Sequence, residues 1–145
     1  MGARREARIA VLKALYAREM GGVQEVDVLA KQIEEIHEIP AVASIFFHAL
    51  LETTITNMED IDKSIEERAQ NWALDRISVI DRNILRLGLA ELLYFEDIPP
   101  RTTINECIEL AKLFGTQESA RFVNGLLDGI LRHLDTTKSK ELDER

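Results

Sequence analysis

The sequence predicts an all-α fold, a single compact bundle of about seven helices. Apolar residues recur three and four positions apart along almost the whole chain, which is the spacing of one face of an α-helix. No stretch alternates strictly between apolar and polar residues, as a half-buried strand does. The 145 residues suit one domain, and no internal repeat or linker divides them. We expect a helical domain over residues 1–134 and a mobile polar tail over residues 135–145.

Two helices are expected in the first forty residues. The first spans residues 4–20 and ends at Gly21 and Gly22, since glycine commonly terminates helices. The second spans residues 26–39, and Pro40 breaks its pattern. The expected inward stripe of the first helix consists of Ile9, Leu12, Tyr16 and Met20.

A third and a fourth helix follow Pro40, because proline fits the first turn of a helix. The third is expected to run to Thr56, and Asn57 is the expected cap of the fourth, which reaches Trp72. Their expected inward residues are Val42, Ile45, Phe46, Ala49 and Leu50 in the third and Met58, Ile61, Ile65 and Ala69 in the fourth.

The fifth helix, over residues 79–95, is expected to be central. Ser78 is its expected cap, after a tight connection over residues 75–78, and Pro99 and Pro100 stop it. Its apolar residues cover more than one face, which is typical of a helix surrounded by others. They are Ile80, Ile84, Leu85, Leu87, Leu89, Leu92 and Leu93.

Two more helices complete the bundle. Thr103 and Glu106 have the spacing of a capping box, which predicts a helix from there to Phe114, closed by Gly115. Thr116 is the expected cap of the last helix. The inward residues of that helix are Phe122, Leu126, Leu127, Ile130 and Leu134.

The single cysteine, Cys107, excludes an intrachain disulfide and a cysteine zinc site. We expect it to be a small packing residue. No apolar run approaches the roughly 20 residues that span a bilayer, and the N-terminus lacks the apolar stretch of a signal peptide. These observations predict a soluble cytoplasmic protein with no membrane association.

The net charge of −8 is unevenly distributed. Residues 1–20 contain five basic and two acidic residues, so this segment is positive on an acidic body. Arg4, Arg5 and Arg8 stand at a helix N-terminus, where positive charge opposes the macrodipole, and we expect them to overhang the core into solvent. Guanidinium groups and first-turn amides together suit a phosphate, which predicts RNA or DNA backbone as ligand. A solvated basic face without a ligand is the alternative, and Glu6 within the cluster favours it.

The sequence lacks the residue patterns of a catalytic centre. Its histidines, His37, His48 and His133, fall on three different expected helices. No HExxH, CxxC or phosphate-binding glycine-rich motif occurs. We therefore expect neither enzyme activity nor a metal or cofactor.

Five segments resemble the NusB family of bacterial transcription antitermination factors, over about residues 4–134. They are ALY at 14–16, WALDR at 72–76, DRNILRL at 81–87, TINECIELAKLFG at 103–115 and FVNGLLD at 122–128. The resemblance implies binding, together with the ribosomal protein NusE, to single-stranded boxA RNA of ribosomal RNA operon leaders. It also implies a complex with RNA polymerase in which premature termination is suppressed.

The resemblance also implies which residues bind. Matching positions in the family predict RNA binding by Arg4, Arg5, Arg8, Glu118 and Phe122, with Lys13 and Arg121 as further phosphate contacts. Tyr16, Asp75 and Asp81 match positions on the face that binds the ribosomal protein. Tyr16 and Phe122 also have the spacing of core residues, which is the interpretation that helical periodicity alone favours.

Two positions depart from the family pattern. Glu6 stands where the family often has a basic residue, and Cys107 replaces a residue that is usually alanine. With few phosphate contacts, we expect modest, salt-dependent RNA affinity that a partner protein must supplement. A helical scaffold that binds only proteins is the alternative function, and a homodimer that covers part of the RNA surface is a second arrangement known in the family.

Overall fold

The computed structural model describes residues 2–69 and 73–143, and all regular secondary structure in them is helical. The described residues form seven α-helices and two short 3-10 helices. Among them, no helix combines the length and the apolar character needed to cross a membrane. The helices are α1 (Ala3–Glu19), α2 (Val26–Ile36), η1 (Ala41–Ala43), α3 (Ser44–Thr56), α4 (Met58–Arg68), η2 (Leu74–Arg76), α5 (Val79–Tyr94), α6 (Pro100–Phe114) and α7 (Ser119–Asp143). The expected all-α bundle is confirmed.

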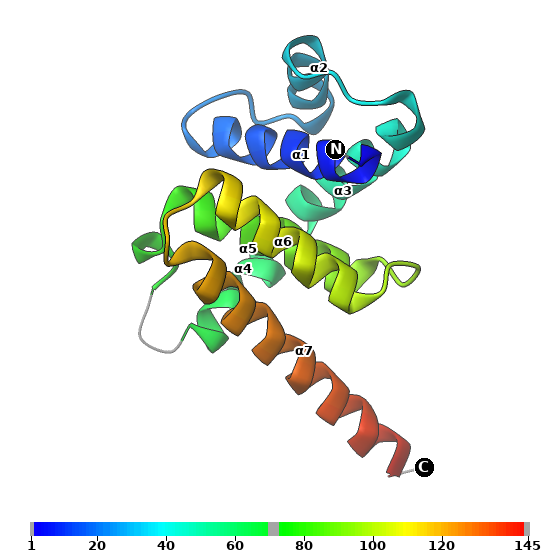
Figure 1. Ribbon diagram of the computed structural model, residues 1–145, viewed down its shortest axis with the longest axis vertical. Coiled ribbons are helices and arrows are strands. Elements are labelled where there is room, and N and C mark those ends of the chain that lie inside the picture. Colours follow the sequence, from blue (N-terminus) through cyan, green and yellow to red (C-terminus); the bar gives the residue numbers. More distant parts are fainter. Residues whose placement is uncertain (1, 70–72, 144–145) are drawn as a thin grey trace.

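Helix α5 lies at the centre of the bundle, as expected. It packs against α1, α3, α4, α6 and α7, and every residue from Asn83 to Glu91 is buried. Helices α1 to α3 gather at one end of the molecule, while α6 and α7 cover the other side of α5 (Figure 1). Gly88 allows the close approach of α6, because a Cβ atom there would lie 2.8 Å from Cys107 Sγ. Cys107 itself is fully buried, which confirms its expected role in packing.

Helix α1 is rotated relative to its expected orientation. Ile9 and Leu12 are buried as expected, but Tyr16 is 42% exposed and Met20 is 60% exposed. The inward face also includes Ala7, Val11 and Leu15, and the small alanine side chain lets neighbouring helices approach. The expected core positions of Tyr16 and Met20 are therefore wrong.

The chain between α2 and α3 differs from the expectation that the second helix runs to residue 39 and the third begins at Pro40. Helix α2 ends at Ile36, and the carbonyl of Pro40 accepts a hydrogen bond from the amide of Ala43 in η1. This 3-10 turn changes the phase of the following helix. Val42 and Ile45, expected in the core, are 85% and 86% exposed, whereas the expected burial of Phe46 and Leu50 is confirmed.

The expected caps have mixed outcomes. The amide of Asp81 donates to Ser78 Oγ at 3.2 Å, so the cap of α5 is confirmed. Asn57 occupies the N-cap position of α4 as expected, but its side chain donates back to the carbonyl of Thr53 and makes no capping hydrogen bond. The expected end of that helix at Trp72 lies outside the described residues. Ile61, Ile65 and Ala69 are buried as expected.

The last two helices are longer than expected. Helix α6 begins at Pro100, so the expected capping box of Thr103 and Glu106 is wrong, and both side chains bond to other helices. Thr116 is the expected cap of α7. Its amide instead donates a hydrogen bond to Ser119 Oγ, so the side chain that accepts at this turn is that of Ser119. Helix α7 continues through Asp143, beyond Leu134, its last expected inward residue.

Candidate functional site

Arg8 lies inside the bundle, so the expectation that it overhangs into solvent is wrong. Its side chain is 3% exposed, and its Nε and Nη2 donate to the Glu91 carboxylate at 2.7 and 2.8 Å. Thr103 Oγ1 donates to the same carboxylate at 3.0 Å. Burial disfavours the charged form, but the hydrogen bonds and charge of Glu91 outweigh it and raise the pKa of Arg8. Arg8 is thus a permanently charged residue that joins α1 to α5.

Arg5 is partly exposed and pairs with α6. Its Nε and Nη2 donate to the Glu106 carboxylate at 2.8 and 3.2 Å, and this pair raises the pKa of Arg5. The two residues are 101 positions apart in the sequence. No sequence pattern indicates such a distant pair, whereas the local spacing of Thr103 and Glu106 indicates a cap.

Arg4 is the exposed member of the arginine cluster. Its guanidinium carbon lies 4.8 Å from the centre of the Phe46 ring, and that of Arg8 lies 5.1 Å from the same ring. Arg4 and Arg8, one turn apart on α1, therefore lie over the same aromatic ring. Phe46 in turn packs edge-on against Phe95, with ring centres 5.8 Å apart.

A cavity of about 410 Å³ lies beside these arginines. It is bordered by the start of α1 and by the start of α6, and it combines guanidinium groups with a hydroxyl and one carboxylate. Guanidinium and hydroxyl donors suit a phosphate oxygen. The residues lining the cavity are Gly2, Arg4, Arg5, Arg8, Ile98, Pro99, Thr102 and Glu106.

Lys13 and Glu6 are linked through a histidine. His37 Nε2 lies 3.0 Å from the Glu6 carboxylate, and His37 Nδ1 lies 3.1 Å from Lys13 Nζ. Glu6, which sequence analysis placed within the basic cluster, therefore pairs with His37, the residue that follows α2. His37 was missed as a site residue because it is 24 positions from Lys13.

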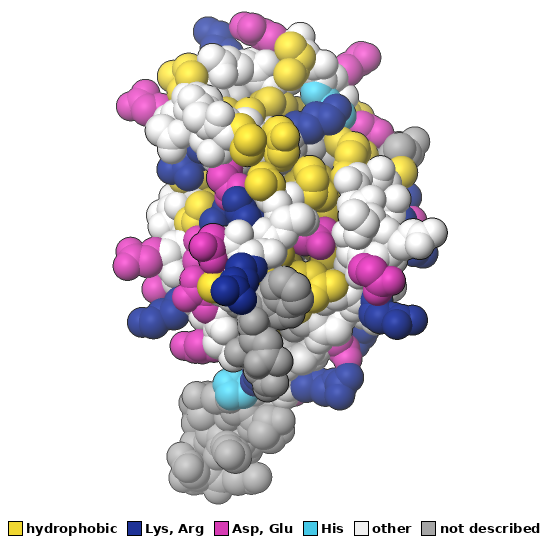
Figure 2. All heavy atoms as spheres, turned by 90° about the vertical axis from the view of Figure 1, so that its left-hand side faces the viewer, with side chains coloured by type: hydrophobic (Ala, Val, Ile, Leu, Met, Phe, Trp, Pro, Cys, Tyr) yellow, Lys and Arg dark blue, Asp and Glu magenta, His cyan; other side chains and the backbone are white. Residues whose placement is uncertain are grey.

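An apolar groove of about 290 Å³ surrounds Tyr16. Figure 2 shows hydrophobic side chains gathered over the upper part of this side of the molecule, with a basic side chain and a histidine beside them. Ile36 is 78% exposed and Phe114 is 40% exposed. Sequence analysis missed both, although each is an apolar residue at the last position of a helix. The groove is lined by Leu12, Lys13, Tyr16, Ala17, Ile33, Ile36, Ile80 and Phe114.

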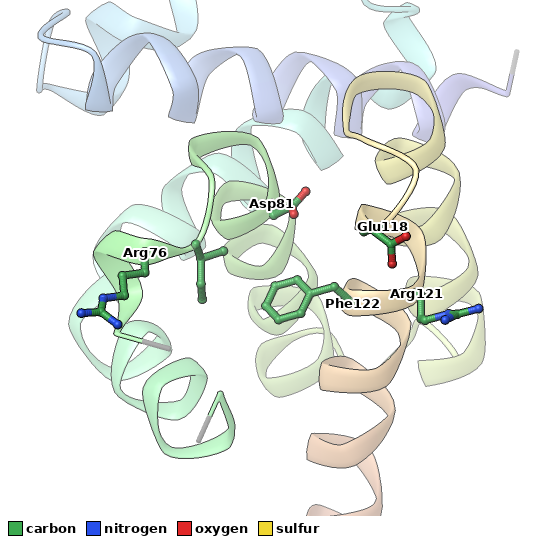
Figure 3. A pocket seen from close by; sticks show the side chains of 6 residues that line it. Arg76, Asp81, Glu118, Arg121 and Phe122 are labelled. Carbon is green, nitrogen blue, oxygen red and sulfur yellow. The ribbon is translucent and has the colours of Figure 1, made fainter. Parts of the chain in front are cut away.

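A third hollow, of about 440 Å³, brings together residues of two predicted surfaces. Asp81 from the partner set lies with Glu118, Arg121 and Phe122 from the RNA set. In Figure 3 the Phe122 ring points into the hollow, and the Arg76 and Arg121 side chains point outward on opposite sides. Asp81 Oδ1 is buried and bonds to no described residue. Asp75 is exposed in η2 and does not line this hollow.

The three hollows follow α6 and the turn into α7. The start of α6 borders the arginine cavity, Phe114 at its end borders the groove, and the start of α7 borders the third hollow. Lys13 lies in the groove with Tyr16, away from the arginine cavity. In the described part of the chain, no group of three or more His, Cys, Asp and Glu side chains could hold a metal ion.

The chain is similar to known proteins over most of its length. A model of the NusB family matches residues 5–132. The transcription antitermination protein NusB of Myxococcus xanthus is 45% identical, over 90% of this chain and 95% of the relative. The protein of the same name from Dehalococcoides mccartyi is 38% identical, over 95% of this chain and 96% of the relative.

Solved structures agree with this similarity. NusB of T. maritima superposes with a TM-score of 0.81 at 38% identity, over 89% of this chain and 90% of that chain. A chain in a crystal structure of antitermination factors NusB and NusE with double-stranded RNA gives a TM-score of 0.81 at 29% identity, over 92% and 98% of the two chains. From its sequence and its fold, the chain belongs to the NusB family.

Proposed function

We propose that this chain is a transcription antitermination factor that binds boxA RNA of ribosomal RNA operon leaders together with NusE. In this proposal the complex joins RNA polymerase and suppresses premature termination. The observation that carries the proposal is the likeness, over nearly the whole of both chains, to a protein crystallised with NusE and double-stranded RNA. The three hollows along α6 and α7 support it, because they hold the residues that such binding requires.

RNA phosphates would bind in the arginine cavity. Arg4 is exposed, and Arg5 retains N–H groups outside its pair with Glu106. The fork of Arg8 is engaged by Glu91, so Arg8 supports Arg4 through Phe46 in this proposal. Lys13 at the groove and Arg121 at the third hollow would add contacts further along the strand.

RNA bases would bind at the third hollow. The Phe122 ring offers a face on which an unstacked base can pack, and such stacking contributes about 1–3 kcal/mol per base. The carboxylate of Glu118 can accept a hydrogen bond from a base amino group. Stacking and base-edge contacts of this kind require single-stranded RNA.

NusE would bind the groove around Tyr16, and the predicted partner residues also include Asp75 on η2 and Asp81 at the third hollow. Tyr16, Ile36 and Phe114 provide an exposed apolar centre, which is typical of the energetically important part of a protein interface. Asp75 and Asp81 provide negative charge for a basic ribosomal protein. A bound NusE would add RNA contacts that the few exposed basic residues of this chain do not provide.

Titration of a labelled single-stranded boxA RNA at several salt concentrations, with and without NusE, tests the proposal. We expect NusE to raise the affinity, and we expect affinity to fall as salt rises, by about 0.7 logarithmic units per phosphate contact for each tenfold increase. Arg4→Ala should weaken binding, whereas Arg68→Ala, an equal charge change at an exposed position of α4, should not. Duplex RNA of the same sequence should bind more weakly.

Two results would reject the proposal. Binding to NusE without any binding to RNA at low salt would identify a scaffold that binds only proteins. Equal RNA affinity with and without NusE would remove the need for a partner. Size measurement in solution, with and without boxA RNA, tests the homodimer, which RNA should dissociate if self-association covers the RNA surface.

A further inference from the structure

The Arg5 guanidinium is held at one edge only. Its Nε and Nη2 bond to Glu106, while Nη1 and one hydrogen of Nη2 remain outside this pair. The side chains of Arg5 and Glu106 are 32% and 21% exposed, so the pair sits at the rim of the bundle. The pair therefore fixes the guanidinium plane and leaves donors at its other edge.

The carboxylate of Glu106 is unexpected in a cavity suited to an anion. It lines the same 410 Å³ cavity as Arg4, Arg5 and Thr102. By charge alone, Glu106 would repel a phosphate and weaken binding. Its two hydrogen bonds to Arg5 suggest the opposite effect, because an arginine that is already ordered loses less conformational entropy when it binds.

We propose that Glu106 is a positioning residue for RNA binding, which holds one edge of Arg5 so that the other edge meets a backbone phosphate beside Arg4 and Thr102. The inference rests on the proposed function, because it assumes that RNA binds in the arginine cavity. It adds Glu106, which is not among the predicted RNA contacts. Arg4 is ordered in a similar way, by its position over the Phe46 ring. The guanidinium groups of Arg4 and Arg5 are thus both oriented before RNA binds.

The charge effect and the positioning effect predict opposite results for the same substitution. Removal of the Glu106 charge should tighten RNA binding if repulsion dominates. In our proposal, Glu106→Ala weakens binding of single-stranded boxA RNA to the complex with NusE by about three- to tenfold, the range expected when one long side chain regains its rotamer freedom.

Glu109 provides the matched control. It lies on the same helix, three residues further, and its carboxylate pairs with Lys112 at 3.4 Å instead of with an arginine of the cavity. Glu109→Ala makes the same charge change, and we expect unchanged or slightly tighter binding. Glu106→Gln keeps the size and one acceptor of the side chain, so its affinity should lie between those of the wild type and Glu106→Ala.

A double substitution tests whether Glu106 acts through Arg5. In the Arg5→Ala background, Glu106→Ala should leave RNA affinity unchanged or slightly tighter, because only the repulsion by its charge is then removed. Thermal unfolding of each variant checks the fold, and a partly exposed ion pair should change it little. The Gln variant gives the same comparison if the Ala variant does not fold.

Three results would overturn the inference. They are equal or tighter RNA binding by Glu106→Ala, an equal loss in Glu109→Ala, and a loss that persists without Arg5. If the wild-type complex itself does not bind RNA, the proposed function fails and the inference falls with it. Binding by the wild type with an unaffected Glu106→Ala rejects the inference alone.

Discussion

Arg8 and Glu91 form a two-point ion pair inside the protein, where α1 crosses α5. Both side chains are nearly inaccessible, with 3% and 0% exposure, and both donor–acceptor distances are below 3 Å. Thr103 adds a hydrogen bond from α6 to the same carboxylate. Three helices therefore meet at one buried charge pair.

We expect Glu91→Ala to lower the free energy of unfolding by about 3–5 kcal/mol, because it leaves the buried guanidinium of Arg8 without its counter-charge. Urea denaturation followed by circular dichroism measures the change. The apolar double variant Arg8→Met with Glu91→Leu should recover most of the loss, since neither charge then remains buried. A cost below about 1 kcal/mol for the single variant would show that water reaches Arg8.

Low pH should destabilise the folded protein through protonation of Glu19. Burial raises the pKa of Glu19, but hydrogen bonds and charges from Arg82 and Arg86 outweigh burial and lower the pKa below its ordinary value of 4.5. A carboxylate whose pKa is lowered by folding stabilises the folded state at pH values above its ordinary pKa. This stabilisation is lost as the pH falls through the lower pKa of the folded state. Unfolding free energies of Glu19→Gln should therefore fall less steeply below pH 4.5 than those of the wild type. Parallel curves for the two proteins would contradict this.

Gly88→Ala should destabilise the protein by about 1–3 kcal/mol, the usual cost of an extra methyl group in a packed core. The added Cβ would lie 2.8 Å from Cys107 Sγ and 3.2 Å from a Leu127 methyl group. In a Cys107→Ala background the cost should be smaller. Gly125→Ala, on α7 with open space around the new Cβ, should instead stabilise by about 0.5–1 kcal/mol. Chemical denaturation of the four variants checks both signs.

Phe114→Ala should lower the affinity for NusE about tenfold or more, because Phe114 is an exposed aromatic residue that lines the proposed partner groove. Leu113 is the matched control. It is 50% exposed on the same helix but does not line the groove, so Leu113→Ala should leave the affinity unchanged. Calorimetric titration with NusE measures both, and equal losses would place the partner elsewhere.

The helical fold was predictable because the apolar spacing of each helix is a local property. The orientation of α1 was not, since the identity of its inward face depends on packing against α3 and α5. Val42 and Ile45 show the same limit: a 3-10 turn after Pro40 shifts the phase of α3, and no residue pattern signals that shift. Periodicity identifies an apolar face, but contacts between helices decide which residues it buries.

The candidate site was predictable in its residue types and less so in its arrangement. Sequence analysis identified Arg4, Arg5 and Arg8 as one cluster, yet burial separates their roles. The partners that decide those roles, Glu106 and Glu91, lie more than 80 positions away. Long-range ion pairs of this kind carry no local signal. The sequence therefore indicates which residues are charged, but not how many of those charges are free to bind a ligand.

The compensated charge of α1 has a consequence in a cell filled with other nucleic acids. A generic polyanion gains affinity mainly by displacing counterions from dense, uncovered positive charge. Here Arg5, Arg8 and Lys13 each lie against a carboxylate or a histidine. A polyanion that binds them therefore displaces few counterions and gains little affinity. Such a surface discriminates by the arrangement of its donors more than by charge density. We therefore expect the protein to bind unrelated RNA weakly compared with the strand in the proposed function.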